Sequence, residues 1–199
     1  MTRKALIELV TRRLKFTDSK AQFSFPYVQG VLDTVWQEMC VKTFNTDIQD
    51  INYYTKLYTA VAIVTDIENE LYHSDLPVEM IRLPRIGEGI ISVNQVDSRS
   101  ADFKPIRESD FRLMTSQEVF RIGTDIYWYT RYDKVYYGES MTSNIIASGV
   151  DMYICIPFSE YDLDEELPLP GGMASTLIEM AVQFLMGTPI VNTDNKNEI

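Results

Sequence analysis

The sequence predicts an α+β fold: a helical bundle, with two N-terminal helices and one C-terminal helix, that carries an inserted, mostly antiparallel β domain. Apolar residues recur at spacings of three and four near both ends of the chain, which is typical of amphipathic helices. The middle reads instead as short alternating runs between turn residues. We therefore expect a helical body of residues 1–50 and 171–187, a β-rich domain of residues 51–170, and a flexible C-terminal arm of residues 188–199.

A basic helix is predicted at residues 2–15. Its apolar residues form one stripe, made of Leu6, Ile7, Val10 and Leu14. Residues 1–20 carry six basic side chains against two acidic ones, whereas the whole chain has a formal net charge of −11. Arg12, Arg13 and Lys15 could therefore contact an acidic neighbour or DNA. The alternative is a solvated helix face.

A second helix is predicted after Ser24, which suits an N-cap, with Pro26 in the first turn. Its buried face is expected to contain Val28, Val31, Leu32, Val35, Trp36 and Met39. Gly30 lies inside this helix, where glycine costs about 1 kcal/mol relative to alanine. Close approach of another helix would explain it.

Residues 56–67 are apolar on both sides of their alternation, so they fit a strand buried on both faces or a helix. Their β-branched residues favour the strand, with a turn at residues 66–69 leading into residues 70–73. Further strands are expected at residues 90–96, 103–106, 119–122, 126–132, 135–137 and 150–157, with a short helix at residues 108–115. Turns are expected at residues 97–100, 123–125 and 133–134.

Aromatic residues occupy both faces of two neighbouring predicted strands. They are Tyr127, Trp128, Tyr129, Tyr136 and Tyr137. A sheet with one wet face would alternate apolar and polar residues. We therefore expect another subunit to cover the outer face of this sheet.

The final helix, residues 173–186, is apolar over much of its circumference and must be buried. Its expected core residues are Leu177, Ile178, Ala181 and Leu185. Residues 188–199 lack periodicity and are predicted to be disordered in the isolated chain. Within this arm, Pro189, Ile190 and Val191 could form an apolar anchor on a neighbour.

The sequence contains no recognisable catalytic or cofactor signature, so we expect no enzyme activity and no cofactor. His73 is the only histidine, and Cys40 and Cys155 are expected to be lone buried thiols. Gly87-Glu88-Gly89 lacks the third glycine and the lysine of phosphate-binding loops, so it is predicted to be a turn.

The acidic run between residues 162 and 166 does not match a calcium-binding loop and is expected to be solvated, so no metal site is predicted. The net charge argues against general nucleic-acid binding. No apolar run reaches the roughly 18 residues of a membrane span, and the N-terminus does not read as a signal peptide.

Two stretches carry a resemblance to a known family. One is a strand ending at a proline, Tyr153–Pro157, followed by Asp164-Glu165-Glu166-Leu167-Pro168 and the helix Leu177–Met186. The other is Glu70-Leu71-Tyr72 with Asp75-Leu76-Pro77 and then Met80-Ile81-Arg82-Leu83. With the strands and short helix between them, residues 20–187 resemble the head–tail connector proteins of tailed bacteriophages, also called portal adaptor or ring proteins. The composition is similar to that of connectors from crAss-like, short-tailed phages.

The resemblance implies a structural virion protein that forms a homo-oligomeric ring of about twelve copies below the portal protein. It implies a central channel through which DNA passes without sequence-specific binding, a C-terminal arm docked on the portal, and contact with downstream ring or tail proteins. We accordingly expect a virion protein assembled in the bacterial host cytoplasm. Two alternatives remain: another phage tail or baseplate subunit, and a small hydrolase or transferase that uses carboxylates.

Overall fold

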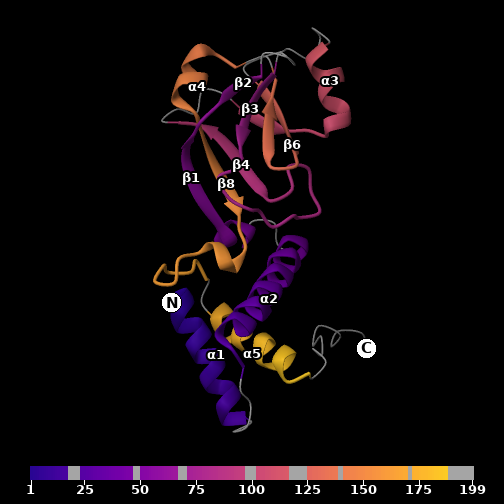
Figure 1. Cartoon of the computed structure of the whole chain (residues 1–199). Coiled ribbons are helices and arrows are strands. Elements are labelled where there is room, and N and C mark those ends of the chain that lie inside the picture. The colour runs from indigo at the N-terminus through magenta and orange to yellow at the C-terminus, as the bar shows by residue number, and fades with distance from the viewer. Residues whose placement is uncertain are drawn as a thin grey trace, which may run out of the picture. The chain divides into compact units, whose positions relative to one another are not determined.

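The computed structural model describes residues 1–17, 23–46, 50–66, 71–96, 102–116, 125–138, 141–169 and 172–187. The chain is an α+β protein, as predicted, with five α-helices and eight strands among these residues (Figure 1). It divides into two compact units. The helical unit comprises residues 1–46 and the described residues from Pro157 onward, and the β unit comprises residues 47–156.

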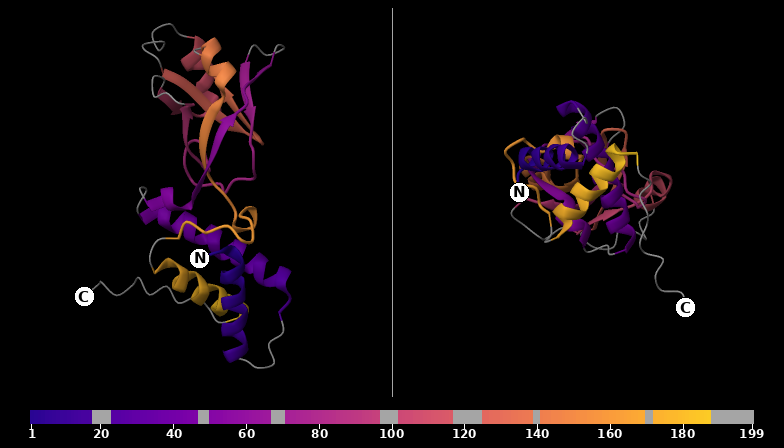
Figure 2. Two further views of the ribbon diagram at one scale, coloured as in Figure 1. Left: turned by 90° about the vertical axis from the view of Figure 1, so that its left-hand side faces the viewer. Right: turned by 90° about the horizontal axis from the view of Figure 1, so that it is seen from below.

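Three helices form the body of the helical unit, and each contacts the other two: α1 (Arg3–Thr17), α2 (Phe25–Thr46) and α5 (Met173–Leu185). Both views in Figure 2 show α5 beside α1 and α2. The predicted apolar stripe of α1 is buried, and so is the predicted face of α2, which also buries Cys40 and Thr43. Each buried Val or Leu side chain contributes about 1.5–3 kcal/mol to folding.

Two details of these helices differ from expectation. Gly30 has nothing within 4 Å of the position that a Cβ would occupy, so no neighbouring helix requires the glycine. On α5 the buried residues are Leu177, Ile178, Ala181 and Val182. Leu185 is only half-buried and Phe184 is exposed, because the apolar circumference of this helix is wider than the face that its neighbours cover.

The chain returns to the helical unit at Pro157, earlier than the expected boundary at residue 170. The reason is a short 3₁₀ helix, Phe158–Glu160, which contacts α2. The Phe158 and Trp36 rings lie 6.1 Å apart, and the backbone N–H of Ser159 donates to the Asp33 carboxylate at 2.7 Å.

The β unit contains two sheets. Its strands are β1 (Thr55–Val61), β2 (Val64–Asp66), β3 (Leu71–Asp75), β4 (Ile90–Gln95), β5 (Asp102–Pro105), β6 (Asp125–Arg131), β7 (Lys134–Tyr137) and β8 (Val150–Cys155). One sheet has the order β1-β8-β4 and the other β2-β3-β7-β6-β5. All pairs are antiparallel except β5 with β6, which confirms the mostly antiparallel prediction.

The prediction of one strand at residues 56–67 is wrong. This stretch contains two strands, β1 and β2, which belong to different sheets and are separated by Ala62 and Ile63. The register of β1 against β8 shifts between Tyr58 and Val61, and Ala60 there has a left-handed φ of 52°. The residues of β1 are half-buried or exposed, not buried on both faces.

The remaining predicted strands that the structure describes are present, and so is the short helix, α3 (Glu108–Ser116). The turn between β6 and β7 falls at Tyr132 and Asp133, one residue earlier than expected. The predicted strand at residues 119–122 and the turns at residues 67–69, 97–100 and 123–124 lie outside the described residues. The sequence analysis missed α4 (Ser143–Ser148), whose first turn is capped by the side chain of Thr142.

The chain itself covers the best-buried residues of the aromatic sheet, and cover of this sheet by another subunit stays a prediction. Trp128 and Tyr137 point to one face and are buried within the β unit. Tyr129 lies on the other face, where Phe111 of α3 covers it with a ring distance of 4.7 Å. A helix of the same chain therefore provides the cover.

Candidate functional site

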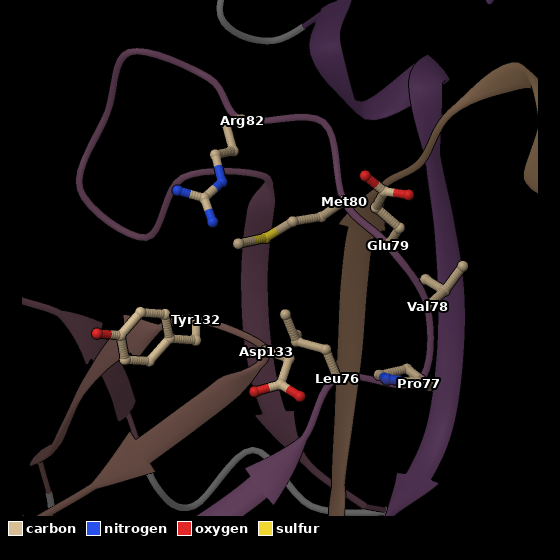
Figure 3. A pocket seen from close by; sticks show the side chains of 8 residues that line it. All are labelled: Leu76, Pro77, Val78, Glu79, Met80, Arg82, Tyr132 and Asp133. Atoms are coloured by element: carbon tan, nitrogen blue, oxygen red, sulfur yellow. The ribbon is translucent and has the colours of Figure 1, made fainter.

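Two hollows in the β unit share Arg82. The first, of about 380 Å³, lies between the segment after β3 and the β6–β7 turn. The side chains of Met80 and Arg82 project from that segment into the space, with Tyr132 and Asp133 across it (Figure 3). The backbone N–H of Leu76 donates to the Asp133 carbonyl at 2.8 Å, so both sides of this hollow are held together.

The second hollow, of about 520 Å³, is lined by Arg82, Leu83, Pro84, Arg85, Ile86, Glu88 and Arg107. Two of these residues, Ile86 and Glu88, belong to the turn of residues 86–89, where a turn was predicted. Gly87 has a φ of +85°, and a Cβ there would lie 2.7 Å from the Trp128 ring. Only glycine therefore fits both this conformation and the close approach of the indole.

Three guanidinium groups dominate the electrostatics of this second hollow. Arg82 pairs with Glu88 at 3.4 Å. Arg85 donates from Nε to the Ile86 carbonyl at 3.1 Å, and its partial burial lowers the pKa of the guanidinium from the ordinary value. Arg107 is exposed and directly precedes α3. Guanidinium forks bind carboxylates and phosphates by paired, charge-assisted hydrogen bonds.

The sequence analysis did not find this site. Its one local signal was the glycine-flanked turn at Gly87-Glu88-Gly89, set between Arg82 and Arg85 on one side and strand β4 on the other. Arg107 comes from beyond β5, so only the fold brings it to the hollow.

The three basic residues predicted to bind partners are all exposed on α1, but they are not equivalent. Arg13 forms an ion pair with Glu179 of α5 at 3.5 Å, with both side chains more than half exposed. Exposed pairs of this kind contribute at most about 1 kcal/mol. Arg12 and Lys15 remain exposed on the helix surface. The predicted anchor of Pro189, Ile190 and Val191 lies outside the described residues.

The helical unit exposes several large apolar side chains. Phe16 is 85% exposed and Tyr27 is 53% exposed. Leu9, Phe25, Phe184 and Met186 are also exposed. They come from all three helices of the unit. Isolated exposed apolar residues are common, but Leu9 and Phe16 are seven residues apart on α1 and so share one face of that helix. Apolar side chains gathered on one face are typical of an interaction surface.

The acidic loop is held on the start of α1 by backbone hydrogen bonds. The N–H groups of Arg3 and Lys4 donate to the carbonyls of Glu165 and Leu163, and the loop leaves Asp162, Asp164 and Glu166 exposed. Across the described ranges, no group of three or more His, Cys, Asp or Glu residues is arranged to hold a metal ion.

His73 lies on β3 at the face of the sheet that also carries Tyr136. The two rings are 5.8 Å apart, and Nε2 lies 3.2 Å from Lys134 Nζ. These contacts are those of a sheet residue with its cross-strand neighbours. Cys40 and Cys155 are buried and form no disulfide, which confirms that prediction.

No protein-family model matches this chain, and no curated protein matches its sequence. In the part of the chain that the structure describes, no helix is both long and apolar enough to cross a membrane.

Proposed function

We propose that the chain is a structural virion protein: a head–tail connector, or adaptor ring, subunit that attaches below the portal and surrounds the DNA channel. The α+β architecture, with helices from both ends of the chain and a β unit inserted between them, agrees with what the resemblance implies. The observation that carries the proposal is the set of exposed apolar side chains on α1, α2 and α5.

Association with another subunit or with the portal would bury the exposed apolar surface of the helical unit. Burial of such surface contributes roughly 25 cal/mol per Å², so side chains such as Phe16 and Phe184 favour association. A ring repeats each contact around its symmetry axis. Modest contacts between single subunits therefore add up to a stable attachment to a ring-shaped partner.

The exposed cations of α1 fit the same surface. Arg12 and Lys15 are close in sequence to Phe16 on α1. Aromatic residues and arginine are the residue types most enriched at the centres of protein interfaces. We therefore assign the exposed part of α1 to subunit or portal contacts, which keeps Arg12 and Lys15 in the partner-binding role that the sequence analysis gave them.

The test is electron microscopy and sedimentation of the full chain, alone and with its candidate portal protein. We expect rings, alone or on the portal. Phe16→Ser with Phe184→Ser should weaken self-association or portal attachment about tenfold or more without lowering the melting temperature. The control is Tyr132→Ser, which removes a side chain that is 75% exposed on the β unit.

A compact small oligomer that ignores the portal would contradict the proposal, and turnover of a substrate by that oligomer would favour the hydrolase or transferase alternative. Rings that form without affinity for the portal would instead favour a tail or baseplate subunit. An equal loss of assembly in Tyr132→Ser would show that the apolar residues of the helical unit have no special role.

A further inference from the structure

The hollow around Arg82, Arg85 and Arg107 is a local concentration of positive charge on an acidic chain. Three guanidinium groups line it together with one carboxylate, that of Glu88, whereas the whole chain has a net charge of −11. Nothing in the proposed connector role accounts for this reversal of charge. A local patch whose charge is opposite in sign to the net charge of the protein is typical of surfaces that select a charged partner.

One carboxylate already occupies part of the hollow. The Glu88 carboxylate pairs with the Arg82 guanidinium at 3.4 Å. Glu88 belongs to the turn in which Gly87 lies against the Trp128 ring. This internal pair shows that the hollow accommodates a carboxylate at its guanidinium groups. Within the described part of the chain, no carboxylate pairs with Arg85 or Arg107. The partial burial of Arg85 is therefore not offset by an acidic partner.

Apart from the three arginines and Glu88, the lining of this hollow is apolar. Leu83 is buried beneath the surface, whereas Pro84 and Ile86 are exposed, the latter by 43%. A ligand that fits this surface has both negative and apolar groups. A peptide with carboxylate and aliphatic side chains supplies both: its carboxylates pair with guanidinium groups and an aliphatic side chain packs on Pro84 and Ile86.

We propose that this hollow binds an acidic peptide segment of a partner protein, whose carboxylates pair with Arg85 and Arg107 and whose apolar side chain rests on Pro84 and Ile86. The site lies wholly within the β unit. It is independent of the apolar surface of the helical unit, so it holds whether or not the chain forms rings.

Nucleic acid is the rival polyanion, and the structure disfavours it. Phosphate binding needs cations distributed along a track, and its strength falls with every nearby anion. Here the cations surround one hollow that contains Glu88, on a chain that repels polyanions overall. The apolar lining also matches an aliphatic side chain better than a sugar–phosphate backbone.

The test uses the full chain and a fluorescein-labelled, capped peptide of sequence Glu-Leu-Asp-Ile-Glu-Leu, followed by fluorescence anisotropy at low ionic strength. We expect saturable binding that added salt weakens. Arg85→Gln with Arg107→Gln should weaken it about tenfold or more, because each change removes a charge-assisted fork. Arg85→Lys should weaken peptide binding less, because lysine keeps the positive charge although it loses the paired N–H donors of the guanidinium.

Two matched variants sharpen the result. Lys4→Gln with Lys42→Gln removes the same amount of charge from exposed positions of the helical unit and should leave peptide affinity within about twofold. Glu88→Gln should increase the affinity several-fold, because it releases Arg82 for the peptide. Circular dichroism and melting temperature establish that each variant is folded.

Three results would overturn the proposal. The first is no saturable binding of the peptide to the folded wild-type chain. The second is an equal loss of affinity in the variant with Lys4→Gln and Lys42→Gln, which would show that only total charge matters. The third is tighter binding, lost in Arg85→Gln with Arg107→Gln, of a single-stranded oligonucleotide of equal charge, which would assign the hollow to nucleic acid.

Discussion

The same residue type has opposite roles at the two ends of α1. Arg12 is exposed, whereas Arg3 is only 7% exposed, donates to the Tyr161 carbonyl and lies 5.3 Å from the centroid of the Phe158 ring. The sequence analysis counted both in the net charge of residues 1–20. A charge count cannot separate them, because the partners of Arg3 come from a distant segment and an arginine stem is apolar enough to be buried.

Tyr137 supplies a prediction about alkaline pH. The ring is fully buried, its hydroxyl donates to Ser74 at 3.1 Å, and burial raises the pKa of the phenol. The unfolded chain ionises this group near its ordinary pKa of about 10. Because the folded pKa is the higher one, the stabilisation is fully present below about pH 10 and is lost as the pH rises further.

Urea unfolding between about pH 8 and pH 11 measures this effect. Tyr137 alone should lower the free energy of unfolding by up to about 1.4 kcal/mol per pH unit above its unfolded pKa. Tyr137→Phe combined with Ser74→Ala removes both hydroxyl groups. The decrease in the free energy of unfolding with pH should then be smaller by the contribution of Tyr137. An unchanged slope in the double variant would show that Tyr137 ionises equally in both states.

Among the helices and strands, those with a local hydrophobic pattern in the sequence were predicted correctly, whereas those set by an unusual backbone conformation were not. The stripes of α1 and α2 are local patterns of period 3.6, and the structure buries them as predicted. The break between β1 and β2 comes just after a register shift in β1, where Ala60 has a left-handed φ. Outside glycine and asparagine, a sequence rarely indicates this conformation. Helix α4 did have a signal, since Thr142 caps its start and Gly149 ends it with a φ of 77°.

The arginine hollow was not predictable in the same way. The turn at residues 86–89 was expected from its glycines, but a turn alone does not identify a binding site. The site exists because Arg107 and the turn meet in the β unit although β4 and β5 separate them in the sequence. Such a non-local arrangement carries no periodicity or spacing for a single sequence to reveal.

Helix α5 supplies a prediction about stability. Leu177 is fully buried on it, whereas Phe184 is 43% exposed. Leu177→Ala should lower the free energy of unfolding by about 2–5 kcal/mol through lost transfer energy and the cavity left behind. Phe184→Ala serves as the matched control and should cost less than about 1 kcal/mol.

Chemical denaturation of the two α5 variants measures the difference. Similar losses for both would mean that the helix is covered around its whole circumference, as its composition first indicated. A negligible loss for Leu177→Ala would mean that α5 does not contribute to the core of the helical unit.

For the whole molecule, the net charge of −11 opposes contact between copies. The apolar side chains of the helical unit should overcome this repulsion more readily in salt, because the Debye length falls to about 10 Å at 0.1 M. We therefore expect self-association, measured by light scattering, to strengthen with added salt, the reverse of peptide binding at the arginine hollow. Weaker self-association in salt would indicate that ion pairs, not apolar contacts, join the copies.

The register of β1 against β8 has a consequence for the order of folding. Thr55, the first residue of β1, pairs with Cys155, the last residue of β8, so the beginning and the end of the inserted unit are brought together. Before this pair forms, α2 and α5 are joined by a long open loop, whose closure entropy opposes their contact. Afterwards only the two connections outside the strand pair remain to be closed, and both are much shorter than the inserted unit. The helical unit should therefore form late, at a rate set by strands that belong to the other unit.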